Sequence, residues 1–243
     1  MSTFIYLQPK HLLLLAKRKI ERFAENATFE HFFQPSFFDL QSGFPLKGRW
    51  REDFFHNKNP IIVELGCGKG EYTVALAAKY PERNFIGIDK KGARMWKGGK
   101  TSHESAMPNV AFVRSHAEMI SSIFGLAEVD ELWITFPEPQ PNSPRSKKRF
   151  TSSQFLKRYI KILKPAGIIH LKTDNDLVYE STLELIQSDK HLLHFASNDL
   201  YLNTSSDQLM DVMAVQTHYE KIWLAKGFKI KYLYFSLNPE TIS

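Results

Sequence analysis

Cysteine is nearly absent from this chain of 243 residues, which contains Cys67 alone. A single thiol excludes an internal disulfide and a cysteine-rich zinc site, so we expect a reduced, cytoplasmic protein. The nine histidines show no H-x-x-x-H spacing, and no metal is expected. Long apolar runs are lacking too. The longest near the start covers only residues 12–16, which is too short to cross a bilayer, so no membrane partner is expected.

Acidic residues are fewer than basic ones. The chain has 32 Lys and Arg against 26 Asp and Glu, a net charge of +6, which favours a polyanionic partner. With 43% hydrophobic residues, we expect one folded domain over residues 60–243. Residues 1–59 are predicted to form an N-terminal extension that packs on this domain. The aromatic-rich, loop-like segment 29–50 either anchors the extension or contacts nucleic acid.

The chain is organised around residues 61–70, I-I-V-E-L-G-C-G-K-G. Their apolar start predicts a buried parallel strand, and the residues after them predict a helix. A strand, a glycine turn and a helix begin a nucleotide-binding unit. The spacing of Gly66, Gly68 and Gly70 is G-x-G-x-G and not the G-x-G-x-x-G of dinucleotide folds. The preceding Glu64 would repel a pyrophosphate but suits the cationic S-adenosyl-L-methionine. The alternative is a tight turn without a ligand.

Asp89 ends the next predicted strand. An acid about 20 residues after the glycine loop can hydrogen-bond both ribose hydroxyls of a bound adenosine. The alternative is that Asp89 caps the following helix. Together with Glu64 and the glycines, Asp89 favours an adenosylmethionine site.

Strands and helices alternate through the rest of the chain. Strands are expected at 60–65, 84–89, 109–114, 130–136, 166–173, 191–196 and 229–236, and helices at 10–23, 71–79, 92–106, 117–124, 151–163, 176–187 and 217–226. Thr151 and Gln154 predict a capping box at the start of one helix. The pattern predicts an α/β fold, a mostly parallel twisted sheet with helices on both faces and an antiparallel edge. Ligands of such sheets bind beyond the carboxyl ends of the strands.

Beyond one such strand end, Phe136-Pro137-Glu138-Pro139 holds a carboxylate between two prolines. Proline fixes φ and restricts the residue before it, so this turn is stiff and suits a preorganised site. The alternative is a purely structural turn. A basic cluster follows at 145–149, containing Arg145, Lys147, Lys148 and Arg149. Basic runs are usually solvated, but at this edge they favour phosphate contacts with a nucleic acid.

Four further motifs follow the glycine loop in order: F-P-E-P at 136–139, K-K-R-F at 147–150, L-K-T-D-N at 171–175 and T-H-Y-E at 217–220. Together they resemble the bacterial tRNA (guanine-N7-)-methyltransferase family over roughly residues 60–236. The resemblance implies a Rossmann-like class I methyltransferase fold and S-adenosyl-L-methionine as cofactor. It also implies methylation of a guanosine in the tRNA variable loop, by a protein that is either a monomer or a homodimer.

The resemblance also implies roles for single residues. Cofactor-binding positions of the family correspond to Glu64, Gly66, Gly68, Gly70, Asp89, His116 and Glu138, with His116 standing where the family usually has an Asp or Asn near the adenine. Glu138 also matches the carboxylate nearest the chemistry. Substrate-binding positions correspond to Asn142, Asp174, Thr217 and Glu220, with Arg145, Lys147, Lys148 and Arg149 expected on the tRNA backbone. The loop departs from the family pattern: Glu138 stands for Asp, Gln140 for Trp, and Asn142 for Lys.

Guanine N7 carries an in-plane lone pair at neutral pH, so its methylation needs alignment and dehydration but no general base. We expect Glu138 nearest the chemistry, with Asp174 and Glu220 holding the base. Two other interpretations stay open. One is a class I methyltransferase with another substrate, and the second is a weakly active or non-enzymatic tRNA-binding paralogue that results from the altered loop.

Overall fold

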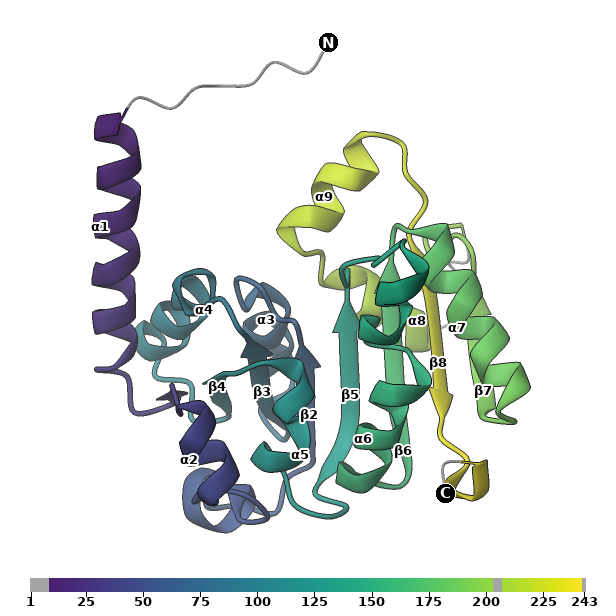
Figure 1. Cartoon of the computed structure of the whole chain (residues 1–243), viewed down its shortest axis with the longest axis horizontal. Helices are drawn as coiled ribbons and strands as arrows, with labels where there is room; N and C mark the ends of the chain where they lie inside the picture. Colours follow the sequence, from purple (N-terminus) through teal and green to yellow (C-terminus); the bar gives the residue numbers. More distant parts are fainter. Residues whose placement is uncertain (1–8, 203–206, 242–243) are drawn as a thin grey trace.

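The computed structural model describes residues 9–202 and 207–241 and forms one eight-stranded sheet (Figure 1). The strands are β1 (Phe32–Phe33), β2 (Ile61–Leu65), β3 (Asn84–Asp89), β4 (Val110–Arg114), β5 (Val129–Thr135), β6 (Leu163–Thr173), β7 (Leu192–Ser197) and β8 (Lys231–Ser236), in the order β1-β4-β3-β2-β5-β6-β8-β7. The pairs from β1 to β6 are parallel, while β8 is antiparallel to both β6 and β7. The predicted parallel sheet with an antiparallel edge is therefore confirmed.

The helices lie on both faces of the sheet (Figure 1). They are α1 (Pro9–Asn26), α2 (Phe37–Ser42), α3 (Glu71–Lys79), α4 (Gly92–Glu104), α5 (Ile120–Ile123), α6 (Ser153–Ile162), α7 (Asp176–Ser188), α8 (Asp207–Ala214) and α9 (His218–Ala225). Shorter helical turns are η1 (Trp50–Phe55), η2 (Ala117–Met119), η3 (Ser143–Lys148) and η4 (Pro239–Thr241). No helix in the described part of the chain is long and apolar enough to cross a membrane.

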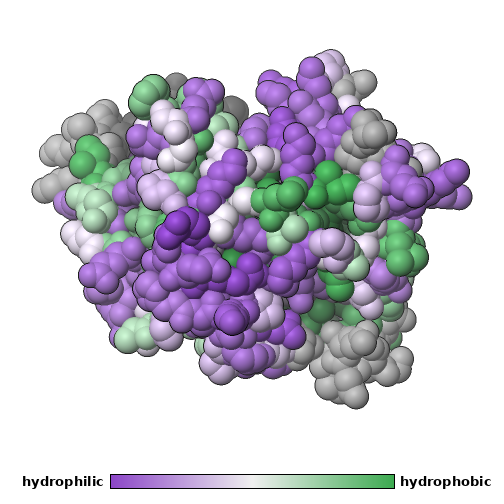
Figure 2. Space-filling view, turned by 90° about the horizontal axis from the view of Figure 1, so that it is seen from below, coloured by the Kyte–Doolittle hydropathy of each residue, from purple (hydrophilic) through white to green (hydrophobic). Residues whose placement is uncertain are grey.

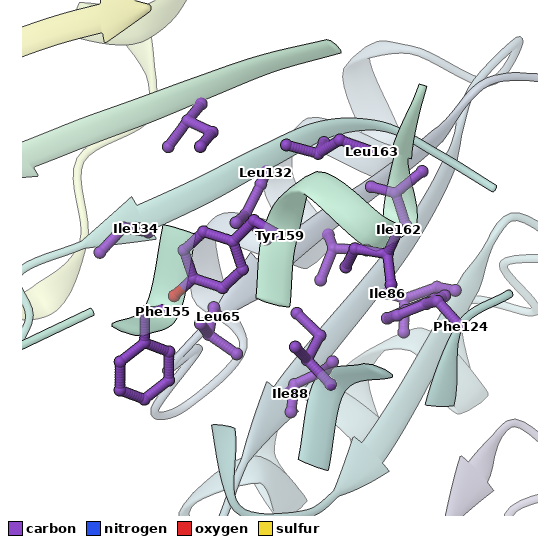
Figure 3. Packing of buried hydrophobic residues seen from close by; sticks show 14 of the residues in the cluster. Leu65, Ile86, Ile88, Phe124, Leu132, Ile134, Phe155, Tyr159, Ile162 and Leu163 are labelled. Carbon is purple, nitrogen blue, oxygen red and sulfur yellow. The ribbon is translucent and has the colours of Figure 1, made fainter. Parts of the chain in front are cut away.

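Successive side chains of β2 point to opposite faces of the sheet, and the core accordingly has two layers. Ile61, Val63 and Leu65 pack with residues of α5, α6 and α7, whereas Ile62 packs on the other face with residues of α3 and α8. Figure 3 shows the first layer, in which side chains of β2, β3 and β5 meet Phe155 and Tyr159 of α6. Because side chains alternate across a strand, Glu64 lies on the face that α3 covers.

The predicted capping box at Thr151 is wrong. Helix α6 begins at Ser153, its N-cap is Ser152, and no side chain caps it. The hydroxyl of Thr151 instead accepts a hydrogen bond from Thr182 of α7 at 2.7 Å. Both threonines are buried, and a buried hydroxyl needs a partner. Thr151 therefore joins two helices.

Residues 29–50 contain more structure than the expected loop. Phe32 and Phe33 form β1, which pairs with β4 and so extends the sheet. Trp50 has no exposed surface, and its indole donates to the carbonyl of Ile123 at 3.1 Å. This part of the N-terminal extension therefore contributes to the hydrophobic core.

The surface at the amino ends of the parallel strands has few features that indicate a site. Seen from below, that surface is mostly hydrophilic, with a hydrophobic patch near its centre and smaller hydrophobic areas toward its sides (Figure 2). The polar groups that matter for chemistry gather at the other end, beyond the carboxyl ends of the parallel strands.

Candidate active site

A pocket of about 630 Å³ opens beyond the carboxyl ends of β2, β3, β4 and β5. This is where ligands bind in open α/β sheets. Among the residues singled out from the sequence, the following line it: Glu64, Gly66, Gly68, Asp89, His116, Glu138, Arg145, Lys148 and Thr217. Its volume suits a small-molecule ligand with part of a second substrate.

The glycine loop shapes one wall, and its glycines serve different purposes. A Cβ on Gly68 would meet no atom within 4 Å, so this residue, with φ of +57°, leaves open space at the pocket. A Cβ on Gly70 would lie 2.6 Å from the Phe112 ring, so Gly70 permits the loop and the start of α3 to pack closely on the sheet. Gly70 does not line the pocket. Of these two glycines, only Gly68 therefore leaves room for a ligand to approach the backbone.

Glu64 is a buried carboxylate at the floor of the pocket, with 4% of its surface exposed. One oxygen accepts from the backbone N–H of Thr73 at 3.0 Å and from its hydroxyl at 2.5 Å. The other accepts from the hydroxyl of Thr135 at 2.7 Å. Burial raises the pKa of Glu64 to about 7, although these three hydrogen bonds oppose the rise. A cationic ligand placed beside it would favour the ionised form.

Asp89 joins the glycine loop to the next turn. It accepts from the backbone N–H of Gly68 at 3.0 Å and from that of Lys91 at 2.8 Å. The N-cap of α4 is Lys91, so the alternative of Asp89 as that helix cap is wrong. Asp89 lines the pocket beside the open space at Gly68, which suits contact with a polar ligand.

The turn carrying Glu138 is held on both sides. Phe136 and Gln140 both have left-handed backbones, with φ of 50° and 47°. Non-glycine residues adopt this conformation only where their surroundings enforce it. The Phe136 N–H donates to the carbonyl of Lys172 at 2.7 Å, and Gln140 donates its side-chain amide to Glu138 at 3.1 Å. Glu138 is exposed to the pocket.

The basic cluster is divided between the pocket and a separate groove, which Lys147 and Arg149 both line. Arg145 and Lys148 of η3 line the pocket, whereas Lys147 lies in this shallow groove between η3 and α7. Arg149 donates to the carbonyls of Pro139 and Gln140 at 3.0 and 3.2 Å. The Arg149 guanidinium therefore holds the turn around Glu138, which is a different task from the expected phosphate contact.

Asn142 and Asp174 lie outside the pocket lining. Asn142 is exposed and precedes η3, and its carbonyl accepts from the Arg145 N–H at 2.8 Å. Asp174 is half-buried, and its carbonyl accepts from Lys231 at 3.0 Å. The expected substrate contacts of Asn142 and Asp174 therefore stay predictions.

Thr217 and Glu220 begin α9, where they form a capping box. The Thr217 hydroxyl accepts from the Glu220 N–H at 3.2 Å. Thr217 and Tyr219 line the pocket, but Glu220 has no exposed surface and its carboxylate lies 2.7 Å from the Lys172 ammonium. The expected base contact of Glu220 is therefore not available in this structure.

Several pocket residues were not anticipated from the sequence. They are Lys69, Lys90, Lys91, Arg94 and Thr135. Lys90 and Lys91 directly follow Asp89, and Thr135 directly precedes the turn of Glu138. Their positions next to Asp89 and to the turn of Glu138 could have indicated that these residues line the pocket. Within the described residues, no cluster of His, Cys, Asp and Glu could hold a metal ion.

Known proteins resemble the chain in both sequence and fold. Residues 58–233 match a family model described as "Putative methyltransferase". The chain is 48% identical to a tRNA (guanine-N(7)-)-methyltransferase of Christiangramia forsetii, over 91% of this chain and 99% of that protein. It is 38% identical to the protein of the same name from Cytophaga hutchinsonii, over 93% and 100%.

Solved structures agree with the fold. The 16S rRNA methyltransferase KamB superimposes with a TM-score of 0.59 at 16% identity, covering 77% of this chain and 92% of that chain. A 30S ribosomal A1408 methyltransferase from an uncultured bacterium gives 0.56 at 16% identity, covering 79% and 98%. At this identity the likeness supports the arrangement of the sheet and helices alone.

Proposed function

The chain belongs to the tRNA (guanine-N(7)-)-methyltransferase family, and from that premise we propose that it methylates N7 of a guanosine in the tRNA variable loop. One observation carries the proposal. A buried carboxylate, an open glycine turn and a second acid, Glu64, Gly68 and Asp89, line the same pocket as the exposed carboxylate of Glu138. The first three suit a cationic nucleoside, and Glu138 suits a second reactant beside it. A tRNA substrate and a free, buried Cys67 are consistent with a cytoplasmic enzyme.

S-adenosyl-L-methionine fits these residues by charge and by space. Glu64 would face a positive group, Asp89 would accept from ribose hydroxyls, and Gly68 leaves room for close approach to the backbone. When bound, this cofactor supplies an electrophilic methyl group. The chain contributes by holding the reactants in line and excluding water, which accounts for a large part of such rate enhancements.

Glu138 has an electrostatic role in this proposal. Guanine N7 attacks with a lone pair, so the chain need not remove a proton before the reaction. The base gains a positive charge as the bond forms, and a fixed carboxylate stabilises that charge. The proline-flanked turn and the two hydrogen bonds from Arg149 hold Glu138 at the pocket.

Cations on two sides of the pocket suit the tRNA backbone. Arg145 and Lys148 lie on the η3 side, and Lys90, Lys91 and Arg94 lie on the side of α4. Phosphate contacts of this kind supply affinity without sequence preference. Selectivity then depends on how the guanosine fits between Glu138 and the start of α9.

The test is methyl transfer from labelled S-adenosyl-L-methionine to unmodified tRNA, compared with a transcript that lacks the variable-loop guanosine. We expect label on the first transcript only. Label on both would move the target to another nucleotide, and label on protein fractions would indicate another substrate. Cofactor binding without any label on RNA would favour a non-enzymatic tRNA-binding protein.

A further inference from the structure

A buried ion pair lies beneath the start of α9. The Lys172 ammonium, on β6, is 2.7 Å from the Glu220 carboxylate, and neither side chain has exposed surface. Lys172 also donates to the carbonyls of Val212 at 2.7 Å and Val215 at 3.3 Å. An ammonium has three N–H donors, and here three acceptors surround it. Lys172 thus connects β6 to the end of α8, the segment after it and the first turn of α9.

Glu220 is satisfied on its other sides too. The Tyr201 hydroxyl donates to it at 2.7 Å, and the Thr217 N–H donates to its second oxygen at 3.3 Å. Gln216 in turn donates to the Tyr201 hydroxyl at 3.1 Å. The whole carboxylate is therefore bound within the protein, and no part of it is exposed to a substrate.

Lys172 also holds the opposite wall of the pocket. Its backbone carbonyl accepts from the N–H of Phe136, the first residue of the turn that carries Glu138. Its side chain holds the segment that brings Thr217 and Tyr219 to the pocket. Lys172 is thus hydrogen-bonded both to the turn that carries Glu138 and to the first turn of α9.

Burial makes this pair expensive. Removing two charges from water costs several kcal/mol per ion, and an apolar pair of similar volume often folds as well or better. Burial lowers the pKa of Lys172, and the neighbouring Glu220 opposes that shift. A buried ion pair therefore contributes less to stability than to the selection of one arrangement of the elements that carry it. The geometry specified here is the rotation of α9 that turns Glu220 inward and Tyr219 toward the pocket.

We propose that Lys172 is a positioning residue, which acts through Glu220 to present Thr217 and Tyr219 to the tRNA. Glu220 anchors α9 and does not contact the guanine. The inference rests on the proposed tRNA methylation, and it concerns only how the α9 side of the pocket is placed. The carboxylates of Glu64 and Asp89 share no hydrogen bond with Lys172 or Glu220. The Lys172 ammonium does lie 5.6 Å from the centre of the Tyr72 ring, which also lines the pocket.

The experiment compares Lys172→Met, Glu220→Gln and the double variant with the unaltered chain. Titration calorimetry measures the Kd of S-adenosyl-L-methionine, and steady-state kinetics measure kcat and KM for tRNA. We expect each single variant to lower kcat/KM for tRNA about 10- to 100-fold, with the cofactor Kd within about threefold. The double variant should be no worse than the poorer single variant, because both changes break one interaction.

Two further variants control for folding and for loss of charge. Tyr201→Phe removes one hydrogen bond to Glu220 without leaving a buried charge unpaired, and should raise KM for tRNA several-fold with the cofactor Kd unchanged. Lys164→Met removes an ammonium that is paired with Asp130 at 2.6 Å at the opposite end of β6 from Lys172, and should leave both constants unchanged.

The proposal is overturned if Glu220→Gln abolishes transfer while Lys172→Met retains it, since Glu220 would then act on the base directly. It is overturned as well if the two single effects multiply in the double variant. If Lys172→Met and Glu220→Gln both lose cofactor binding, the test depends on Tyr201→Phe. An unaltered KM of Tyr201→Phe for tRNA then refutes the proposal. An unaltered chain that methylates no tRNA refutes the proposed function itself, which sets that failure apart from the others.

Discussion

Replacing Glu64 with Gln tests the electrostatics of the cofactor site. In the folded chain the pKa of Glu64 rises from the ordinary 4.5 to about 7, mainly because the carboxylate is buried. Gln has the same shape, and its amide can keep partners among Thr73 and Thr135. The variant therefore removes the titration while preserving the packing.

The sign and size of the effect follow from linkage. A raised pKa means that the folded chain holds a proton that the unfolded chain has released, so stability falls as pH rises between 4.5 and about 7. At about 1.4 kcal/mol per pKa unit, the shift of Glu64 corresponds to about 3 kcal/mol. Below pH 4.5 this contribution is fully present, and above pH 7 it is lost.

The assay is urea unfolding without ligand from pH 4.5 to 8, with the Gln variant measured in parallel. Other titrating groups are common to both proteins and cancel in the difference. We expect the free energy of unfolding of the unaltered chain to fall by about 3 kcal/mol relative to the variant across this window. A difference that stays constant with pH would refute the view that Glu64 is a buried, proton-binding group.

Cofactor binding gives the complementary result. Because a cation favours the ionised carboxylate, the affinity of the unaltered chain for S-adenosyl-L-methionine should rise with pH up to about 7 and then level off. The Gln variant should bind more weakly at pH 8 and lack the part of the pH dependence that Glu64 causes. Equal profiles for the two proteins would place the positive group of the cofactor elsewhere.

Glu138→Ala should lower turnover much more than cofactor affinity, and an equal loss of both would make Glu138 a cofactor ligand. Neutralising Arg145 and Lys148 should weaken tRNA binding and reduce the slope of log K against log salt by about one per lost contact, whereas Arg149→Ala should lower kcat and leave that slope unchanged. An altered slope for Arg149→Ala would return it to the phosphate interface. Gly70→Ala should destabilise the fold by about 1–3 kcal/mol in urea unfolding, because its Cβ would lie 2.6 Å from the Phe112 ring, and an unchanged stability would show that the ring moves aside.

Local patterns in the sequence were sufficient for strands β2 to β8 and for the glycine turn that follows β2. Ile61, Ile62 and Val63 form a strand because a run of β-branched residues suits a buried, pleated surface. The glycines follow because only a tight left-handed turn brings the chain from that strand into α3. These relations link residues close in sequence, so they can be read without knowing what packs against them.

The aromatic-rich extension was predicted less well. Its apolar content indicated burial, but strand β1 consists of Phe32 and Phe33 alone and exists because β4 offers an unpaired edge. A strand of two residues carries no readable period. Trp50 likewise finds its hydrogen-bond partner on Ile123, far along the chain.

Tertiary structure alone decided the roles of Arg149 and Glu220. In the sequence, Arg149 is one member of a basic run, and Glu220 is an acid at the start of a helix. In the fold, Arg149 binds the carbonyls of the turn around Glu138, and Glu220 pairs with Lys172 of β6. The sequence by itself determined the strands, the glycine turn and the side chains available at their ends. The partner of each buried charge depends on long-range packing. A buried ion is stable only beside an opposite charge or hydrogen-bond partner, and tertiary folding brings that partner from a distant part of the chain.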